Sequence, residues 1–369
     1  MTRYSAGRPA GISWTLHGTR VNVDSESEEA IAYARAHLGA TLDVLPAPHL
    51  RITLGWHWGG GGRNAARASE AAAGGAAPER VGKDLHDLGG ELVWGRIPGF
   101  EGLTMRAARE AAGVHVSAAT SYTPRDPLSR VRYLRASRRA RKTHRTLFKL
   151  MYYGVYYPLI WHFERTRGWS LLHASAVERD GRAVILSGLG GVGKSTLALS
   201  LMADPSFRFI SDNLILHDDE RIYALPEPVR LDGSSLSAIS AAGFAPATSD
   251  VPPTAHPKPT YRVEAARVAD SARADVVILL RSARRPVIRP LGPEEALAHL
   301  VAARDLVREV DGYRSVAAFL SMATVDESIK VAAPASLAAL TARSRAYLLG
   351  IGEGEPVDVT LARIREVCA

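Results

Sequence analysis

The chain has 369 residues, of which 46% are hydrophobic and 23% are charged, so it can bury one large core or two smaller ones. Its one cysteine, Cys368, excludes an internal disulfide, and no run of about 18 apolar residues predicts a membrane span. The N-terminus lacks the apolar core of a signal peptide. We therefore expect a cytoplasmic protein.

The net charge of +8 is concentrated in one segment. Ten Arg or Lys residues and one acid, Asp126, lie between Arg125 and Lys149, which gives this segment a net charge of +9. The part Arg130–Lys149 contains neither Gly nor Pro and is predicted to be a helix. Two interpretations stay open: a solvated helix face, or a docking site for an anionic partner such as an acidic peptide, a nucleic acid or a membrane surface. No nucleic-acid-binding motif accompanies the charges, so nucleic acid is the least favoured partner.

The first 125 residues predict a small N-terminal α+β domain with a recognition or accessory role. Residues 50–55 and 91–94 are apolar runs of strand length. The glycine run 59–62 and the Ala/Gly-rich stretch 65–77 are typical of a loop or linker. A basic helical connector over residues 126–165 is expected to follow. Pro158 is predicted to interrupt this connector, with a second helix possible after it.

An α/β pattern begins at Trp169 and defines the predicted catalytic domain, residues 166–369. The predicted strands are residues 171–177, 183–187, 207–210, 276–280 and 346–349, and the predicted helices are residues 195–203, 293–310 and 359–367. Residues 232–260 are rich in Pro, Gly and Ser and predict a long loop that closes over the acceptor of the reaction. The order strand, loop, helix, strand predicts an α/β fold.

A glycine-rich motif carries the chemistry of this domain. Residues 188–195, GLGGVGKS, match the P-loop pattern G-x-x-x-x-G-K-[ST] at every position. The glycines let successive backbone N–H groups point at one phosphate group, and the following helix adds the positive end of its dipole. The predicted nucleotide-binding residues are Gly188, Gly190, Gly191, Val192, Gly193, Lys194, Ser195 and Thr196. Lys194 is expected to reach the β- and γ-phosphates, and the Ser195 hydroxyl is expected to bind Mg²⁺.

A P-loop enzyme also needs an acid that holds the metal ion. Asp212 follows the predicted strand 207–210 at its carboxyl end, where ligands gather in open α/β sheets. Asp275 precedes a strand and so lies at the wrong end. We therefore predict Asp212 and Ser195 as metal ligands. A turn or helix cap is the alternative role for Asp212.

These features together resemble the HPr kinase/phosphorylase-like family, whose members include kinases of peptide natural-product precursors such as lasso peptides. The resemblance rests on LHASAV at residues 172–177, the turn at residues 180–181, the P-loop and ISDN at residues 210–213. It implies a kinase domain of the C-terminal type of that family, with ATP and Mg²⁺ as cofactors. It also implies that Asp212 is a base, a metal ligand or both, and that His173 lies near the phosphates. A buried core histidine is the alternative for His173.

Two features depart from the family pattern. Asn213 stands where the family has a second acid, and an amide cannot take up a proton, so Asp212 would have to serve as both base and metal ligand. No segment clearly matches the C-terminal phosphorylase signature, so neither the reverse reaction nor HPr as substrate is implied. His256, Lys258 and Arg262 are either solvated loop charges or groups that neutralise the transferring phosphoryl group.

The sequence thus predicts a kinase that moves the γ-phosphate of ATP to a hydroxyl, with Asp212, His173 and Lys194 as catalytic residues. The expected acceptor is a Ser or Thr of a peptide or protein. Two alternatives stay open: a kinase of a sugar or amino-acid hydroxyl, and a nucleotide-binding regulatory protein with weak or no catalysis. A homo-oligomer is compatible with the sequence.

Overall fold

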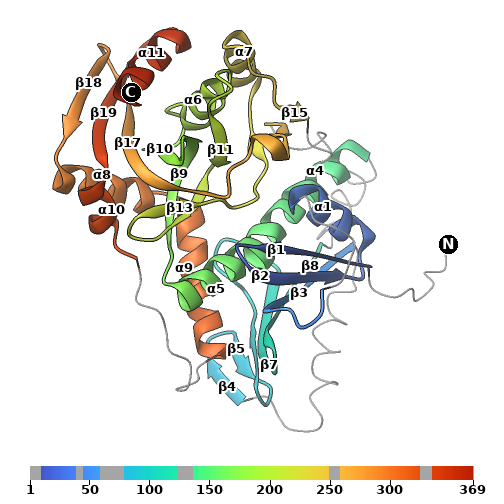
Figure 1. Ribbon diagram of the computed structural model, residues 1–369. Coiled ribbons are helices and arrows are strands. Elements are labelled where there is room, and N and C mark those ends of the chain that lie inside the picture. Colours follow the sequence, from blue (N-terminus) through green and yellow to red (C-terminus); the bar gives the residue numbers. More distant parts are fainter. Residues whose placement is uncertain are drawn as a thin grey trace. The chain divides into compact units, whose positions relative to one another are not determined.

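The computed structural model describes residues 10–38, 45–58, 79–122, 136–248, 258–324 and 335–368. The chain divides into two compact units. Unit 1 holds residues 1–162, 254–256 and 312–330, and unit 2 holds residues 163–253, 257–311 and 331–369. Both units combine helices with a large sheet, so the fold is mixed α/β, as expected (Figure 1). The three predicted domains, with a separate connector, stay a prediction.

Unit 1 is built on an eight-stranded sheet in the order β1-β2-β3-β8-β7-β6-β5-β4. Its strands are β1 (Ala10–Leu16), β2 (Thr19–Ser25), β3 (Leu50–Trp58), β4 (Glu79–Gly82), β5 (Leu85–Asp87), β6 (Glu91–Trp94), β7 (Leu103–Glu110) and β8 (Gly113–Tyr122). Strand β3 is parallel to both β2 and β8, whereas the other pairs are antiparallel. Leu50, Ile52 and Leu54 alternate along β3 and are buried, as the two-residue repeat of a strand requires. Strands β3 and β6 are the two that the sequence predicts. The predicted linkers at residues 59–62 and 65–77 lie outside the described residues.

Unit 1 contains α1 (Glu28–Leu38) and most of a continuous helical stretch made of α4 (Ala136–Met151), the π-helix η1 (Tyr152–Tyr156) and α5 (Tyr157–Arg167), which passes into unit 2 after His162. The predicted interruption at Pro158 is therefore wrong, whereas the alternative of a second helix with the proline near its first turn is confirmed. The Tyr157 N–H donates to the Tyr152 carbonyl five residues back, so the helix is widened directly ahead of the proline. Pro158 then occupies the first turn of α5, where a missing N–H is tolerated. The predicted basic helix corresponds to α4, although residues before Ala136 are not described.

Unit 2 is built on a second mixed sheet in the order β10-β9-β12-β13-β17-β19-β18, with β11 paired to β9. Its strands are β9 (Ser170–Arg179), β10 (Arg182–Gly188), β11 (Arg208–Ser211), β12 (Leu214–His217), β13 (Arg221–Tyr223), β17 (Ser271–Ala283), β18 (Val287–Leu291) and β19 (Arg345–Gly352). Strand β10 pairs antiparallel with β9 and parallel with β17. The loop that follows β10 therefore starts in the middle of the sheet.

Helices cover both faces of this sheet (Figure 1). Successive residues of β10 alternate between two cores: Ala183 and Ile185 contribute to one, Val184 and Leu186 to the other. Helices α8 (Pro293–Asp305) and α10 (Leu337–Arg343) pack into the first core. Helices α6 (Lys194–Leu201), α7 (Gly233–Ala241) and α11 (Val357–Cys368) pack into the second. Unit 2 is thus a three-layer α/β/α arrangement.

Two predictions about the elements of the second half are corrected. Residues 232–260 are not one long loop, because α7 lies ahead of the first proline, Pro246, and Asp232 caps it by accepting from the Ser235 N–H at 2.9 Å. The strands β14 (Val229–Arg230), β15 (Ala247–Thr248) and β16 (Thr260–Arg262) form a small third sheet around it. Within the segment that is predicted to close over the acceptor, residues 249–257, including His256, lie outside the described residues.

The predicted helix at residues 293–310 is in fact two helices, α8 and α9 (Arg308–Ala323). The buried residues of α8 belong to unit 2, whereas α9 belongs to unit 1 from Gly312 on. Across the described part of the chain, no helix combines the length and apolarity that crossing a bilayer requires.

Candidate functional site

The glycine-rich loop connects β10 to α6, the strand–loop–helix order that the sequence predicts. Gly188, Gly191 and Gly193 have φ angles of 144°, 83° and 92°, in the region that favours glycine. At Gly188 an added Cβ would lie 2.5 Å from the Leu280 carbonyl oxygen of β17, so only glycine fits there. No side chain caps the start of α6 at Gly193. The first N–H groups of the helix can therefore bind an anion.

Lys194 is the first residue of α6 and is buried. Its ammonium donates to the carbonyl oxygens of Gly188 at 2.8 Å and Leu189 at 3.0 Å, so it lies against its own loop. A positive charge is thereby fixed beside the loop amides, where a polyphosphate would place its oxygens.

Asp212 directly follows β11, and its carboxylate accepts hydrogen bonds from two serines. The Ser195 Oγ lies 2.9 Å from both carboxylate oxygens, and the Ser175 Oγ donates to Oδ1. The two predicted metal ligands, Ser195 and Asp212, are therefore neighbours although 17 residues separate them. The sequence analysis missed Ser175. It is two residues beyond His173 on β9, so both side chains lie on the same face of that strand.

His173 lies in the middle of β9 and is buried. Burial and, next, the nearby positive charge of Lys194 lower the pKa of His173 to about 4. The imidazole is therefore neutral at pH 7 and can donate or accept a hydrogen bond, but it contributes no positive charge. His173 is close enough to Lys194 to be affected by its charge, and both its position near the phosphates and its role stay predictions.

A second buried acid, Glu227, lies next to Asn213. The Asn213 Nδ2 is 3.3 Å and 3.5 Å from the two Glu227 carboxylate oxygens, and the Arg230 guanidinium is 3.9 Å from one of them. Asn213 itself has a φ of 68°, which turns the chain directly after Asp212. Glu227 thus places a second carboxylate next to Asn213, and the expectation that Asp212 serves as both base and metal ligand stays a prediction. Glu227 stands between Pro226 and Pro228, where neither a strand nor a helix pattern drew attention to it.

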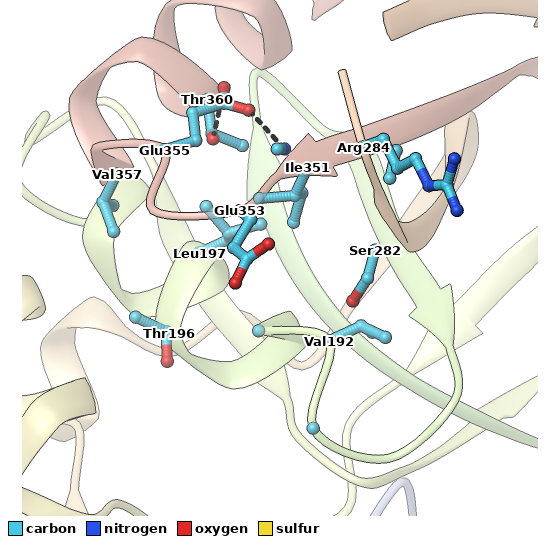
Figure 2. Close-up of a pocket in the computed structure, with 14 residues that line it drawn as sticks. Val192, Thr196, Leu197, Ser282, Arg284, Ile351, Glu353, Glu355, Val357 and Thr360 are labelled. Atoms are coloured by element: carbon cyan, nitrogen blue, oxygen red, sulfur yellow. Dashed lines mark hydrogen bonds between the residues drawn. The ribbon is translucent and has the colours of Figure 1, made fainter. Parts of the chain in front are cut away.

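A cavity of about 560 Å³ lies on another side of the loop (Figure 2). Its walls come from the loop and α6, from the end of β17, and from the connection between β19 and α11; the residues are Gly191, Val192, Gly193, Thr196, Leu197, Ser282, Ala283, Arg284, Ile351, Gly352, Glu353, Glu355, Val357 and Thr360. Neither Lys194, Ser195 nor Asp212 lines it. Its volume suits a small ligand of nucleoside size.

One carboxylate of this cavity is firmly held. Glu355 accepts from the Gly352 N–H at 2.7 Å and from the Thr360 Oγ1 at 3.0 Å, and it pairs with Arg363. These contacts fix the connection between β19 and α11, so this wall of the cavity is rigid. The exposed Glu353 and Arg284 supply polar groups at the same cavity (Figure 2).

The residues around Asp212 were also tested for their fit to Mg²⁺. Within the described ranges, no three His, Cys, Asp or Glu side chains cluster closely enough to hold a metal ion by themselves. The serine hydroxyl and carboxylate of Ser195 and Asp212 are hard oxygen ligands that Mg²⁺ accepts, and Mg²⁺ commonly takes one or two protein oxygens together with substrate phosphates and water. The donor set therefore fits a magnesium ion that arrives with a polyphosphate.

Two other predicted cations lie on or just before β16, the strand that pairs with β14. Lys258 pairs with Asp232 at 3.0 Å, at the cap of α7, and Arg262 lies on β16. Asp275 lies within β17, where it pairs with Arg345 at 2.9 Å. Its exclusion as a metal ligand agrees with this structural ion pair.

Comparison with known proteins adds little. No protein-family model and no curated protein match the chain. Among solved structures, the Hpr(Ser) kinase/phosphatase from Coxiella burnetii matches with a TM-score of 0.25 and 15% identity, over 54% of this chain and 91% of that chain. A similarity of this size assigns neither a family nor an activity.

Proposed function

We propose that the protein is a kinase that transfers the γ-phosphate of ATP to a hydroxyl group, in the first place that of a Ser or Thr in a peptide or protein. One observation carries the proposal: the P-loop serine, Ser195, lies 2.9 Å from the carboxylate of Asp212, directly beside the P-loop lysine. A phosphate-binding loop with an adjacent metal-binding acid is what phosphoryl transfer from a nucleotide requires. The choice of ATP and of a peptide acceptor comes from the sequence resemblance.

The nucleotide would lie across the loop. Its phosphates would bind the N–H groups between Gly188 and Ser195 and the ammonium of Lys194, and its nucleoside would fill the cavity lined by Leu197 and Ile351. Asp212 does not line this cavity, so the nucleoside would not compete with the acceptor for space near Asp212.

Ser195 and Asp212 would hold Mg²⁺ together with phosphate oxygens. Bound there, the ion would neutralise negative charge on the phosphates and help to fix them. Lys194 would contribute a second positive charge from the protein itself. Positioning and charge neutralisation supply most of the catalysis in phosphoryl transfer.

The acceptor hydroxyl would approach from the side of Asp212 and Asn213. Its oxygen forms a bond to the γ-phosphorus while the bond from that phosphorus to the β-phosphate oxygen breaks, and ADP leaves. The hydroxyl proton passes to the carboxylate of Asp212, whereas Asn213 can only hydrogen-bond the hydroxyl. Glu227 would orient Asn213 from 3.3 Å and keep a second negative charge near the acceptor. The neutral His173 would donate a hydrogen bond to a phosphoryl oxygen.

The proposal is tested with γ-labelled ATP, Mg²⁺ and peptides encoded beside the gene. The wild type is compared with Lys194→Ala, Asp212→Asn and Glu227→Gln, and Glu294→Gln at the exposed start of α8 serves as a control. We expect label on a Ser or Thr of one peptide. The rate should fall about 10²–10⁴-fold in Asp212→Asn, as for the loss of a general base, and should be unchanged in Glu294→Gln.

The other outcomes decide between the alternatives. Label on a metabolite from a cell extract, with none on any peptide, would favour a small-molecule kinase. Tight ATP binding without transfer to peptides or to extract metabolites would contradict the kinase proposal and favour a regulatory nucleotide-binding protein.

A further inference from the structure

Helix α4 of unit 1 carries a row of four cations, here called the basic stripe: Arg141, Lys142, Arg145 and Lys149. Their spacing places all four within about 100° around the helix axis, on one face. Arg141 and Arg145 are exposed, and Lys142 and Lys149 are half-buried. From Arg141 to Lys149 the stripe is about 12 Å long, at about 1.5 Å per residue. The helix contains no Asp or Glu.

The two lysines are held in place by uncharged groups. The Lys142 ammonium lies 4.6 Å from the centre of the Tyr122 ring. The Lys149 ammonium donates to the Gly99 carbonyl at 2.8 Å and lies 5.5 Å from the centre of the Phe100 ring. Over the described ranges of the chain, no carboxylate lies within 4 Å of any of the four cations. Burial and, next, the charges of Arg145 and Lys142 lower the pKa of Lys149, so these cations lie close enough to repel one another.

The two arginines of the stripe are exposed and do not belong to the packed face of α4. Like charges at i,i+4, such as Arg141 and Arg145, destabilise a helix, and the opposite face of α4 already supplies the packing through Thr143, Leu147 and Leu150. Four adjacent cations, two of them held in place and all four without a carboxylate among the described residues, provide a surface complementary to several negative charges.

We propose that the basic stripe of α4 binds an acidic segment of a polypeptide partner. A segment of about four extended residues, at about 3.3 Å each, matches the length of the stripe. The apolar face of α4 is buried within unit 1, so the helix has no face to insert into a bilayer. The rings nearest the stripe, Tyr122 and Phe100, face the ammonium groups of Lys142 and Lys149, which leaves no stacking platform for nucleic-acid bases. The surface is independent of the proposed kinase activity, because it lies on unit 1.

The test is direct binding, measured by fluorescence anisotropy with a labelled Asp/Glu-rich peptide and its Asn/Gln counterpart. The wild type is compared with the triple variant Arg141→Glu, Lys142→Glu, Arg145→Glu. The matched control is Arg80→Glu, Lys83→Glu, Arg96→Glu, which makes the same change in net charge at exposed positions of unit 1. Circular dichroism and thermal melts establish that all three proteins are folded.

We expect the acidic peptide to bind the wild type and the control, and to bind the stripe variant at least about 10-fold more weakly at low salt. The binding should weaken further as salt is raised towards 1 M, where charges are screened over about 3 Å. Equal binding to the wild type and the stripe variant would overturn the proposal. So would binding of single-stranded DNA or of anionic phosphatidylserine vesicles by the stripe where the acidic peptide does not bind.

Discussion

The charged side chains around the glycine-rich loop of unit 2 and those on helix α4 of unit 1 are arranged in opposite ways. Around the glycine-rich loop of unit 2 the charges are buried, and each contacts a group that matches it: Lys194 contacts two carbonyls, Asp212 two hydroxyls, and Glu227 Asn213 and Arg230. On helix α4 of unit 1 the charges have one sign and face water or neutral groups. A buried charge needs a hydrogen-bonding or oppositely charged partner, which fixes its position, and fixed positions are what a catalytic site requires. Exposed charges of one sign attract an oppositely charged partner over a longer distance, and salt weakens that attraction.

The largest expected effect compares one lysine from each region. Lys194→Ala should weaken ATP binding at least about 100-fold, because it removes charge-assisted hydrogen bonds of about 1.5–3 kcal/mol each to the phosphates. Lys142→Ala removes the same ammonium from the basic stripe and should leave ATP affinity unchanged. Calorimetric titration of both variants measures the difference. Equal losses would mean that the two regions do not differ as described.

The second prediction uses two glycines of the same loop. Gly188→Ala should lower the free energy of unfolding by about 2–3 kcal/mol, because its Cβ would meet the Leu280 carbonyl at a φ that side chains rarely adopt. Gly190→Ala meets no atom within 4 Å and should change stability by less than about 0.5 kcal/mol. Urea unfolding of both variants checks this. A similar loss in both would mean that crowding by β17 does not shape the loop.

The third prediction concerns the pH dependence of stability that the buried His173 adds. Its pKa is lowered to about 4 in the folded state from 6.5, so the unfolded chain binds the proton more tightly. The contribution of the neutral His173 to the free energy of unfolding is fully present above pH 6.5 and is lost as the pH falls towards 4. Between pH 7 and pH 5 the wild type should lose about 2 kcal/mol more than His173→Gln, measured by urea unfolding. His217, also buried with a lowered pKa, is unchanged in both proteins and cancels in the difference. If the free energies of unfolding of the two proteins changed equally with pH, His173 would have to be in contact with water rather than buried.

The smallest expected effect is a gain of stability on helix α4. Arg145→Glu replaces two like-charge i,i+4 pairs, with Arg141 and with Lys149, by two pairs of opposite charge. The free energy of unfolding should rise by about 0.3–0.8 kcal/mol at low salt and by less at high salt, measured by urea unfolding. A loss of stability would show that Arg145 contributes to the fold, which would weaken the case for a binding surface.

The sequence predicted the strand, the glycine-rich loop and the helix at residues 183–201 because their geometry is local. Glycines are required where φ is positive, and the strand and helix on either side carry apolar patterns of their own. The position of Asp212 could also be predicted, because this residue directly follows a recognisable strand. Its contacts with Ser195 and Ser175 depend on how β9, β11 and α6 come together, yet strand order alone indicated the correct edge of the sheet.

The features that the sequence did not predict depend on contacts between residues distant in the chain, or on a local change of helix geometry that accommodates a proline. Glu227 comes from a stretch without regular structure, so only the folded chain shows that it lies against Asn213. Pro158 follows a π-helical turn that no hydrophobic pattern signals, so the helix continues where the proline predicts a break. Helix α7 was not predicted, because the prolines that follow its end indicated a loop over the whole segment. The parallel pairing of β3 with β2 and β8 likewise depends on partners far along the chain.

The contacts of Lys194 affect which nucleotides the loop would select. Its ammonium donates to two carbonyl oxygens, at 2.8 Å and 3.0 Å, which hold it beside the loop. Because an ammonium has three N–H donors, it can keep these two bonds and also donate to a phosphate oxygen at the β- or γ-position. A nucleoside monophosphate could fill the cavity yet leave the lysine where it lies. The loop would in this way select nucleotides by the number of their phosphates, favouring di- and triphosphates over monophosphates without any contact to the base.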